Sequence, residues 1–179
     1  MFDREEEMDR YLDEIKDMLR RKQYAAVRDL LLPLEPPDIA MLLEESGEEF
    51  MPLLYRLLPK ELAADTFVEM DSDMQEKLIT GFSDYELHAL VDELYVDDTV
   101  DIIEDMPANM VSRILRNTDA STRSQINQLL NYPKDSAGSI MTTEFVDLKE
   151  TMTVEDALKR IRRTGPDKET INVCYVIDD

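Results

Sequence analysis

Residues 83–106 read SDYELHALVDELYVDDTVDIIEDM, and this stretch decides the fold. Its apolar side chains recur at helical spacing in two groups: Leu87, Leu90, Val91 and Leu94, then Val100, Ile103 and Met106. The spacing predicts two short amphipathic helices joined by a turn. Ser83 is followed three residues later by Glu86, the spacing of a capping box, which marks the start of the first helix.

The same two-helix pattern repeats along the chain. Proline or serine punctuates it every 22 to 26 residues, at Pro37, Pro59, Ser83, Pro107 and Pro133. Each interval reads as two short helices, and Ser72 with Gln75 has the capping-box spacing of a helix start. Two further helices are expected over residues 4–21 and 23–32. Repeats of this length predict helix pairs that stack into a superhelix, each burying its apolar face on its neighbours.

From Pro133 onward the sequence no longer shows the two-helix pattern. Small, turn-forming residues over 135–139 predict a linker. Glu144–Leu148 and the β-branched run Thr170–Ile177 predict two strands, with a short helix between them whose N-cap is Thr153. Such a strand–helix–strand unit is too small to bury its own core, so the tail reads as the first half of a domain.

We therefore predict an all-α domain followed by an α/β fragment. The expected domains are a right-handed superhelix of short helix pairs over residues 1–131, a linker over 132–143 and an incomplete α/β unit over 144–179. The 43% of apolar residues is enough for a packed core.

The net charge of the chain limits the kinds of molecule that it can bind. The chain of 179 residues carries 20 basic and 41 acidic groups, a net charge of −21, and most of the acidic excess precedes Pro133. So acidic a body repels phosphate backbones, which disfavours nucleic acid, and it favours cations or a basic protein surface. The sequence shows neither a signal peptide nor an apolar run of the roughly 20 residues that span a bilayer, so we expect a soluble chain.

The sequence contains few residues in arrangements that are typical of an active site. The single histidine, His88, has no nucleophile beside it in the predicted helix, and we expect it at the surface or a groove edge. The single cysteine, Cys174, excludes an intrachain disulfide and falls in a strand that reads as core. Four glycines form no phosphate-binding loop, and the Cys and His ligands of a zinc site are absent. We predict that the chain is not an enzyme.

Two ladders of acidic residues are the best candidates for a site. Asp97, Asp101 and Asp105 stand four residues apart, on one face of the predicted helix. Like charges at this spacing cost a helix roughly 0.2–0.5 kcal/mol per pair, and no Lys or Arg occurs from Asp92 to Asn109 to offset the cost. A similar ladder of Glu61, Asp65 and Glu69 lies 36 residues upstream.

Two interpretations of the ladders stay open on residues alone. In the first, acids from adjacent helices hold a divalent cation such as Mg²⁺, which prefers oxygen ligands and often takes only one or two carboxylates. Asp97 and Asp101 would supply two ligands from one helix and Asp65 a third from the preceding repeat. In the second, the ladders are solvated faces of a very acidic protein, such as a helical-repeat adaptor that binds a basic protein.

A family resemblance favours the first interpretation. Five segments carry it, in this order: Pro59-Lys-Glu-Leu-Ala-Ala-Asp65, Asp97-Asp98-x-x-Asp101, Tyr132-Pro-x-Asp-x-Ala-Gly138-x-x-Met-Thr142, Met152-Thr-Val-Glu-Asp-Ala-Leu158 and Gly165-Pro-Asp-x-Glu-Thr-Ile171. Together they resemble the cytosolic N-terminal part of an MgtE-type magnesium transporter. The resemblance covers nearly the whole chain, and its run from Tyr132 to Ile171 is specific.

The resemblance implies a Mg²⁺ sensor on the cytoplasmic side of a membrane. In that family a helical N domain precedes two CBS domains and a membrane-embedded dimeric pore, and Mg²⁺ between the N and CBS domains locks the pore closed. When Mg²⁺ falls, the acidic surfaces repel and the N domain swings away. The positions that match the family's N-domain ligands are Asp65, Asp97 and Asp101. The CBS-side ligands and the pore would lie beyond Asp179, so we expect half-formed sites and no transport by this chain alone.

Overall fold

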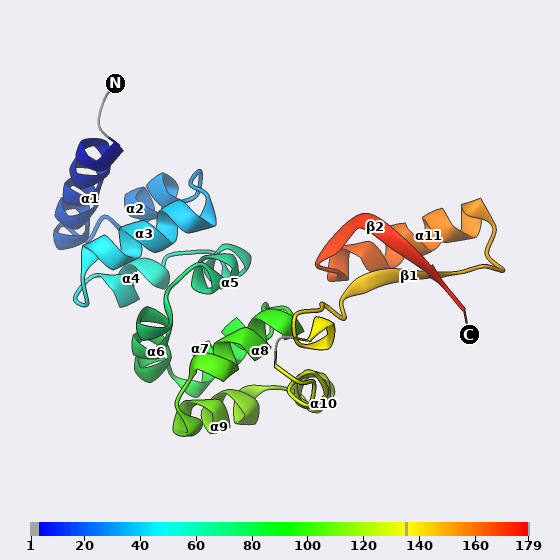
Figure 1. Ribbon diagram of the computed structural model, residues 1–179. Coiled ribbons are helices and arrows are strands. Elements are labelled where there is room, and N and C mark those ends of the chain that lie inside the picture. The colour runs from blue at the N-terminus through cyan, green and yellow to red at the C-terminus, as the bar shows by residue number, and fades with distance from the viewer. Residues whose placement is uncertain (1–3, 135, 179) are drawn as a thin grey trace. The chain divides into compact units, whose positions relative to one another are not determined.

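Helices dominate the computed structural model, which describes residues 4–134 and 136–178. Two helices come first, α1 (Arg4–Arg20) and α2 (Tyr24–Leu31), as the apolar spacing predicts. Four pairs follow (Figure 1): α3 (Pro36–Ser46) with α4 (Met51–Tyr55), α5 (Lys60–Val68) with α6 (Ser72–Gly81), α7 (Asp84–Val91) with α8 (Val96–Asp105), and α9 (Ala108–Asn117) with α10 (Ala120–Leu129). The two-helix repeat is therefore confirmed in each predicted interval.

The predicted punctuation marks the start of each pair. Pro59 and Pro107 are the N-caps of α5 and α9, where a proline costs no helical hydrogen bond. Ser83 caps α7 in a complete capping box: its hydroxyl accepts from the Glu86 N–H, and the Glu86 carboxylate accepts from the Ser83 N–H at 2.8 Å. The start of each of these helices is determined locally, because it depends on residues within one helical turn of the capping proline or serine.

The second predicted capping box is wrong. Asp71, and not Ser72, is the N-cap of α6, and its Oδ1 accepts from the Met74 N–H at 2.7 Å. Gln75 is buried instead, and its Nε2 donates to the Phe67 carbonyl at 2.9 Å. Aspartate is at least as good an N-cap as serine, so the cap moves one residue toward the N-terminus and frees Gln75 to join α5 to α6.

The chain folds into two compact units, each described here by itself. Unit 1 holds the residues before Tyr95 together with Ile102–Thr118. Unit 2 holds Tyr95–Asp101 and the residues after Thr118. The domain boundaries expected from the sequence, 1–131, 132–143 and 144–179, stay a prediction.

The first helices of successive pairs form the body of unit 1. α1 packs on α3, α3 on α5, α5 on α7 and α7 on α9. Apolar side chains from α3 to α7 are among the most fully buried in this unit: Ile39, Leu42, Leu43, Leu54, Phe67, Leu78, Ile79 and Leu87. Burial of each such side chain contributes about 1.5–3 kcal/mol, so the pairs hold one another in place as the repeat predicts.

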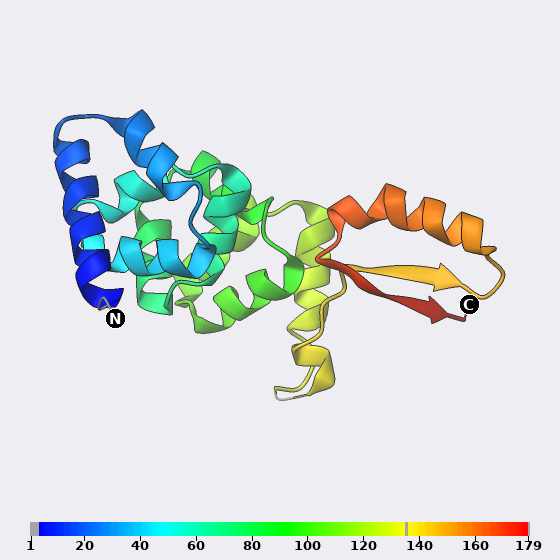
Figure 2. The same cartoon turned by 90° about the horizontal axis from the view of Figure 1, so that it is seen from above.

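Unit 2 contains the predicted strand–helix–strand. The strands β1 (Phe145–Lys149) and β2 (Thr170–Ile177) pair in parallel, and α11 (Val154–Thr164) connects them. Figure 2 shows α11 running along the two strands. Thr153 caps α11 as predicted, and Arg160 of this helix donates to the Asp147 carbonyl at 2.7 Å and pairs with the Asp147 carboxylate.

The sheet of unit 2 is only partly covered. Val146 is buried, whereas five large apolar or aromatic side chains of β2 are exposed: Ile171, Val173, Tyr175, Val176 and Ile177. Cys174 is half-buried, so its predicted place in a core is wrong. One helix on a two-stranded sheet leaves most of β2 facing solvent.

The connection before the sheet contains one close contact. A Cβ at Gly138 would lie 2.3 Å from Cδ1 of Tyr132, so this approach of ring and backbone requires glycine. Asp135, within the predicted linker, lies outside the described residues. The described helices all fall short, in length or in apolar character, of what crossing a bilayer requires.

Candidate metal centre

The first turn of α8 carries the acids of interest. Because α8 begins at Val96, Asp97 and Asp98 lie near the positive end of the helix dipole, which favours negative side chains. Thr99 is buried and its hydroxyl donates to the Tyr95 carbonyl at 2.9 Å, which fixes the turn. Asp101 follows one turn later and is exposed.

A carboxylate from beside the sheet caps this helix end. The Val96 N–H donates to Oε2 of Glu144 at 2.7 Å. The Glu144 carbonyl in turn accepts from the Glu169 N–H at 3.1 Å. Since β1 and β2 are parallel, their starts lie at one edge of the sheet, which brings Glu144 and Glu169 together beside the first turn of α8.

Asp97 lies in an environment that disfavours its charge. One carboxylate oxygen, Oδ1, is buried and has no hydrogen-bond partner among the described residues. Burial raises the pKa of the Asp97 carboxyl above its usual value, and the charges of Glu169 and Asp101 raise it further. The backbone N–H groups of Asp97 and Asp98 lower this pKa without reversing the shift. A cation or a proton would be stabilised at such a position.

Asp65 presents a different environment, in unit 1. It lies in α5 and is exposed, as are Glu61 and Glu69 of the same ladder. Partial burial, followed by the charge of Glu61, raises the pKa of Asp65. The structure brings Asp97 close to Asp101 within unit 2, and the inclusion of Asp65 in one site with them stays a prediction.

The donors around Asp97 suit a hard cation. Carboxylate oxygens are the ligands that Mg²⁺ prefers, and the unpartnered Oδ1 offers one without first losing a hydrogen bond. Asp97, Asp101 and Glu169 are the residues of unit 2 that could contribute. Over residues 4–134 and 136–178, no three His, Cys, Asp or Glu side chains are already arranged to hold a metal ion.

Sequence reasoning missed Glu144 and Glu169 as neighbours of the ladder. The signal was present in part, because Glu144 begins one predicted strand, Glu169 directly precedes the other, and a strand–helix–strand unit pairs its strands in parallel. Their position beside α8 is a tertiary contact between segments 48 residues apart in the case of Val96 and Glu144, and no local pattern encodes it.

His88 has a structural role, as expected for a surface residue. It is exposed on α7, with Nδ1 2.8 Å from the Asn117 carbonyl and 3.4 Å from Asp92 Oδ1. The imidazole thus joins the end of α9 to α7 within unit 1. Among the described residues, no Ser or Cys side chain is hydrogen-bonded to it, so the arrangement lacks a nucleophile–base pair.

Comparison with known proteins matches the chain to one family. The family model described as the MgtE intracellular N domain matches residues 34–135. The chain is 31% identical over 169 residues to a protein of Thermus thermophilus named magnesium transporter MgtE, and 25% identical over 162 residues to a protein of the same name from Bacillus subtilis. These alignments cover 92% and 90% of this chain but only 37% and 36% of the relatives, so the chain spans little more than a third of their length.

Solved structures agree with the fold. A crystal structure of the cytosolic domain of the Mg²⁺ channel MgtE in complex with ATP matches with a TM-score of 0.85 and 31% identity, over 94% of this chain and 69% of that one. The soluble part of a magnesium transporter matches with a TM-score of 0.82 and 25% identity, over 96% and 68%.

Proposed function

The chain belongs to the MgtE family, and we propose that it is the Mg²⁺-sensing part of a magnesium transporter, on the cytosolic side of the membrane. In this proposal the chain is a regulatory module without catalytic activity. Its partners are the CBS domains and the pore of a longer homodimeric protein, of which it forms the N-terminal portion.

One observation carries the proposal: the buried, unpartnered Oδ1 of Asp97 beside two further carboxylates. Burial of a charged oxygen without a donor costs free energy, and a retained ligand is one physical reason to keep it. Glu169 and Asp101 raise the local negative potential, which strengthens the attraction for a divalent ion. The family and the chemistry of the donors both indicate Mg²⁺ as that ion.

The sensing mechanism follows from an incomplete coordination shell. Asp97 and Asp101 would provide ligands from this chain, with Asp65 as the proposed third, and acids elsewhere in the transporter would complete the shell. A ligand shifts a conformational equilibrium only through its differential affinity for the two states. A shell completed in the closed state alone supplies that difference, so Mg²⁺ favours the closed pore. When Mg²⁺ leaves, the facing carboxylates repel and the closed arrangement weakens.

The test is Mg²⁺-dependent protection in the transporter that contains this chain. We expect millimolar Mg²⁺ to slow tryptic cleavage of its cytosolic part, and the double substitution Asp97→Asn with Asp101→Asn to abolish the protection. Asparagine keeps the size of each side chain and removes its charge. Cleavage rates with Mg²⁺ and with a chelator give the comparison for each protein.

Asp13→Asn with Asp17→Asn is the matched control. These residues also stand one turn apart, on α1, and both are exposed, so the control removes the same charge away from the proposed site. It should retain the protection. Protection that is absent in the native protein, or that survives loss of Asp97 and Asp101, contradicts the proposal and favours an acidic adaptor for a basic protein.

A further inference from the structure

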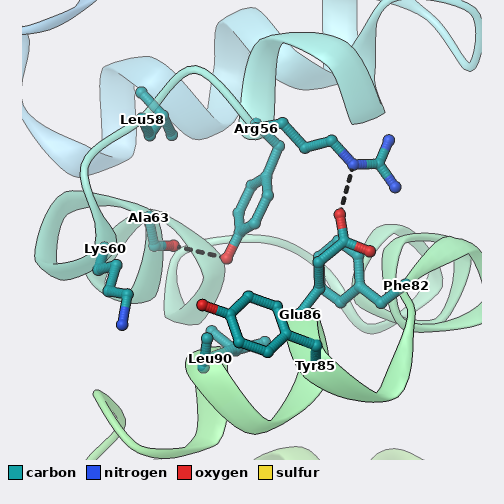
Figure 3. Close-up of a pocket in the computed structure, with 10 residues that line it drawn as sticks. Arg56, Leu58, Lys60, Ala63, Phe82, Tyr85, Glu86 and Leu90 are labelled. Carbon is teal, nitrogen blue, oxygen red and sulfur yellow. Dashed lines mark hydrogen bonds and ion pairs between the residues drawn. The ribbon is translucent and has the colours of Figure 1, made fainter.

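A cavity of about 360 Å³ lies within unit 1, between α5 and α7, and takes no part in the proposed Mg²⁺ site. Its wall includes the end of α4 and the turn that leads into α5 (Figure 3). The volume is within the range of about 300–1,000 Å³ that is typical of pockets for small molecules. None of Asp65, Asp97 and Asp101 lines it.

Three of the ten residues that line the cavity are aromatic: Tyr55, Phe82 and Tyr85. The buried rings of Tyr55 and Phe82 pack with centroids 5.5 Å apart and an interplanar angle of 35°. The Tyr55 hydroxyl donates to the Ala63 carbonyl at 3.0 Å, and burial raises the pKa of this hydroxyl, so it stays protonated. Its polar group is therefore satisfied, and the two rings offer an apolar surface to an occupant.

Tyr85 stands at the mouth of the cavity. Tyr85 is 76% exposed, the largest exposed fraction among the tyrosines in the described residues, and it belongs to α7, which buries Leu87, Leu90 and Val91. An aromatic ring held at a cavity entrance by a helix can stack on a planar ligand at small conformational cost.

The two cations of the cavity differ. Arg56 donates from Nε to Oε1 of Glu86 at 2.6 Å, and this contact, with the Ser83 N–H, lowers the Glu86 pKa to about 2, so the arginine is neutralised by a charged partner. Lys60 forms no ion pair with any described residue. Figure 3 shows Lys60 on the opposite side of the cavity from the Arg56–Glu86 pair, with the Tyr85 ring between them. The cavity thus holds one uncompensated positive charge in a chain of net charge −21.

We propose that this cavity binds a small planar aromatic carboxylate, with its ring between Tyr85 and the wall formed by Tyr55 and Phe82 and its carboxylate paired with Lys60. One lysine supplies a single point charge, which suits one carboxylate better than a phosphate that needs several donors. The acidic chain repels free anions, so most of the binding free energy would come from stacking of the ligand's aromatic ring. Lys60 would favour a ligand with a carboxylate over a neutral ligand.

The probe is 2-naphthoate, titrated into the 179-residue chain with ¹³C-labelled methyl groups. We expect saturable shifts of the Leu58 and Leu90 methyl signals, which report from the cavity wall. Lys60→Met should weaken naphthoate binding about three- to fivefold, the effect of one partly exposed ion pair, and leave binding of the neutral analogue 2-naphthalenemethanol unchanged. Tyr85→Ala should weaken both ligands, and since Tyr85 is exposed this variant should stay folded.

Lys22→Met, in the turn between α1 and α2, is the matched control and should leave both ligands unaffected. Absence of saturable shifts at Leu58 and Leu90 overturns the site. Equal shifts at Val173 and Val176 of the exposed strand β2 also overturn it, because they would show general adhesion to apolar surface. Naphthoate binding that is insensitive to Lys60→Met overturns the anionic class of ligand. Each outcome is independent of Mg²⁺, so failure here leaves the proposed sensing function untouched.

Discussion

The two acidic ladders share a sequence pattern and differ in environment. One ladder belongs to α5 and its C-cap and comprises Glu61, Asp65 and Glu69; the other belongs to α8 and comprises Asp97, Asp101 and Asp105. All three acids of the α5 ladder are exposed. In the α8 ladder Asp97 is half-buried, one of its oxygens lacks a partner among the described residues, and Glu169 adds its charge.

The difference teaches that i,i+4 spacing of acids does not by itself identify a site. Exposed like charges are screened by water and salt and cost little, so the spacing of the α5 ladder is not by itself evidence of a bound cation, and the place of Asp65 in the site stays a proposal. A half-buried carboxylate with like-charged neighbours is screened less. The α8 ladder is consequently the one whose occupancy by a cation should have measurable effects.

The largest expected effect concerns Mg²⁺ affinity in the longer protein of which we propose this chain to be the sensing part. Asp97→Asn should weaken Mg²⁺ binding by about tenfold, or about 1.4 kcal/mol, because it removes a charged ligand at a partly buried position. Glu69→Gln, in the α5 ladder, should change it less than about twofold. Isothermal titration of both variants measures the contrast. Equal effects would show that the two ladders are equivalent and would remove the basis of the comparison.

The next effect concerns the helix end that carries Asp97. Glu144→Ala removes the acceptor of the Val96 N–H and should destabilise unit 2 by about 1 kcal/mol, as loss of an N-cap does. Glu144→Gln keeps an oxygen acceptor and should cost less than half as much. Hydrogen exchange of the α8 amides measures both. An equal loss in the two variants would assign the role of Glu144 to its charge instead of its hydrogen bond.

A smaller effect should appear without metal. Asp97→Asn removes a half-buried charge and its repulsion with Glu169 and Asp101, and should stabilise unit 2 by roughly 0.2–0.5 kcal/mol at pH 7 in the presence of a chelator. In the longer protein with saturating Mg²⁺, Asp97→Asn should instead be destabilising, because the native carboxylate then binds the cation. Urea unfolding with each additive gives the two values, and destabilisation in chelator would contradict the environment described for Asp97.

The smallest effect concerns pH. The pKa of Asp97 is raised in the folded chain, so between its unfolded and folded pKa values the folded state binds more protons, and unit 2 loses stability as pH rises through this window. Asp119, whose pKa is lowered by hydrogen bonds from Thr122 and Ser121, should show the opposite: stability that is lost as pH falls. Carboxyl ¹³C titration should place Asp97 above Asp119, and Glu169→Gln should lower the Asp97 value.

Much of the helical architecture could be predicted because its signals are local. Proline and serine breaks set the starts of α5, α7 and α9, and the spacing of apolar residues identified the buried faces. The cap of α6 was misplaced by one residue because Asp71 and Ser72 are both good caps and the pattern does not rank them.

The candidate site was predicted less completely, for a physical reason. Asp97 and Asp101 could be found as neighbours, because one helix holds both. Burial of the Asp97 carboxylate and its proximity to Glu169 depend on how a helix start meets the edge of a sheet. The incomplete burial of Cys174 has the same origin, since a β-branched strand reads as buried whether or not anything covers it.

The bare surface of β2 has a practical consequence. In the described part of the chain each strand of this sheet has only one neighbour, so β2 offers an unpaired edge of eight residues lined with valine, isoleucine and tyrosine. Such an edge is a template for strand addition between molecules. When the 179-residue chain is expressed by itself, we therefore expect aggregation at high protein concentration to start from β2. Val173→Lys should raise the concentration at which aggregation begins.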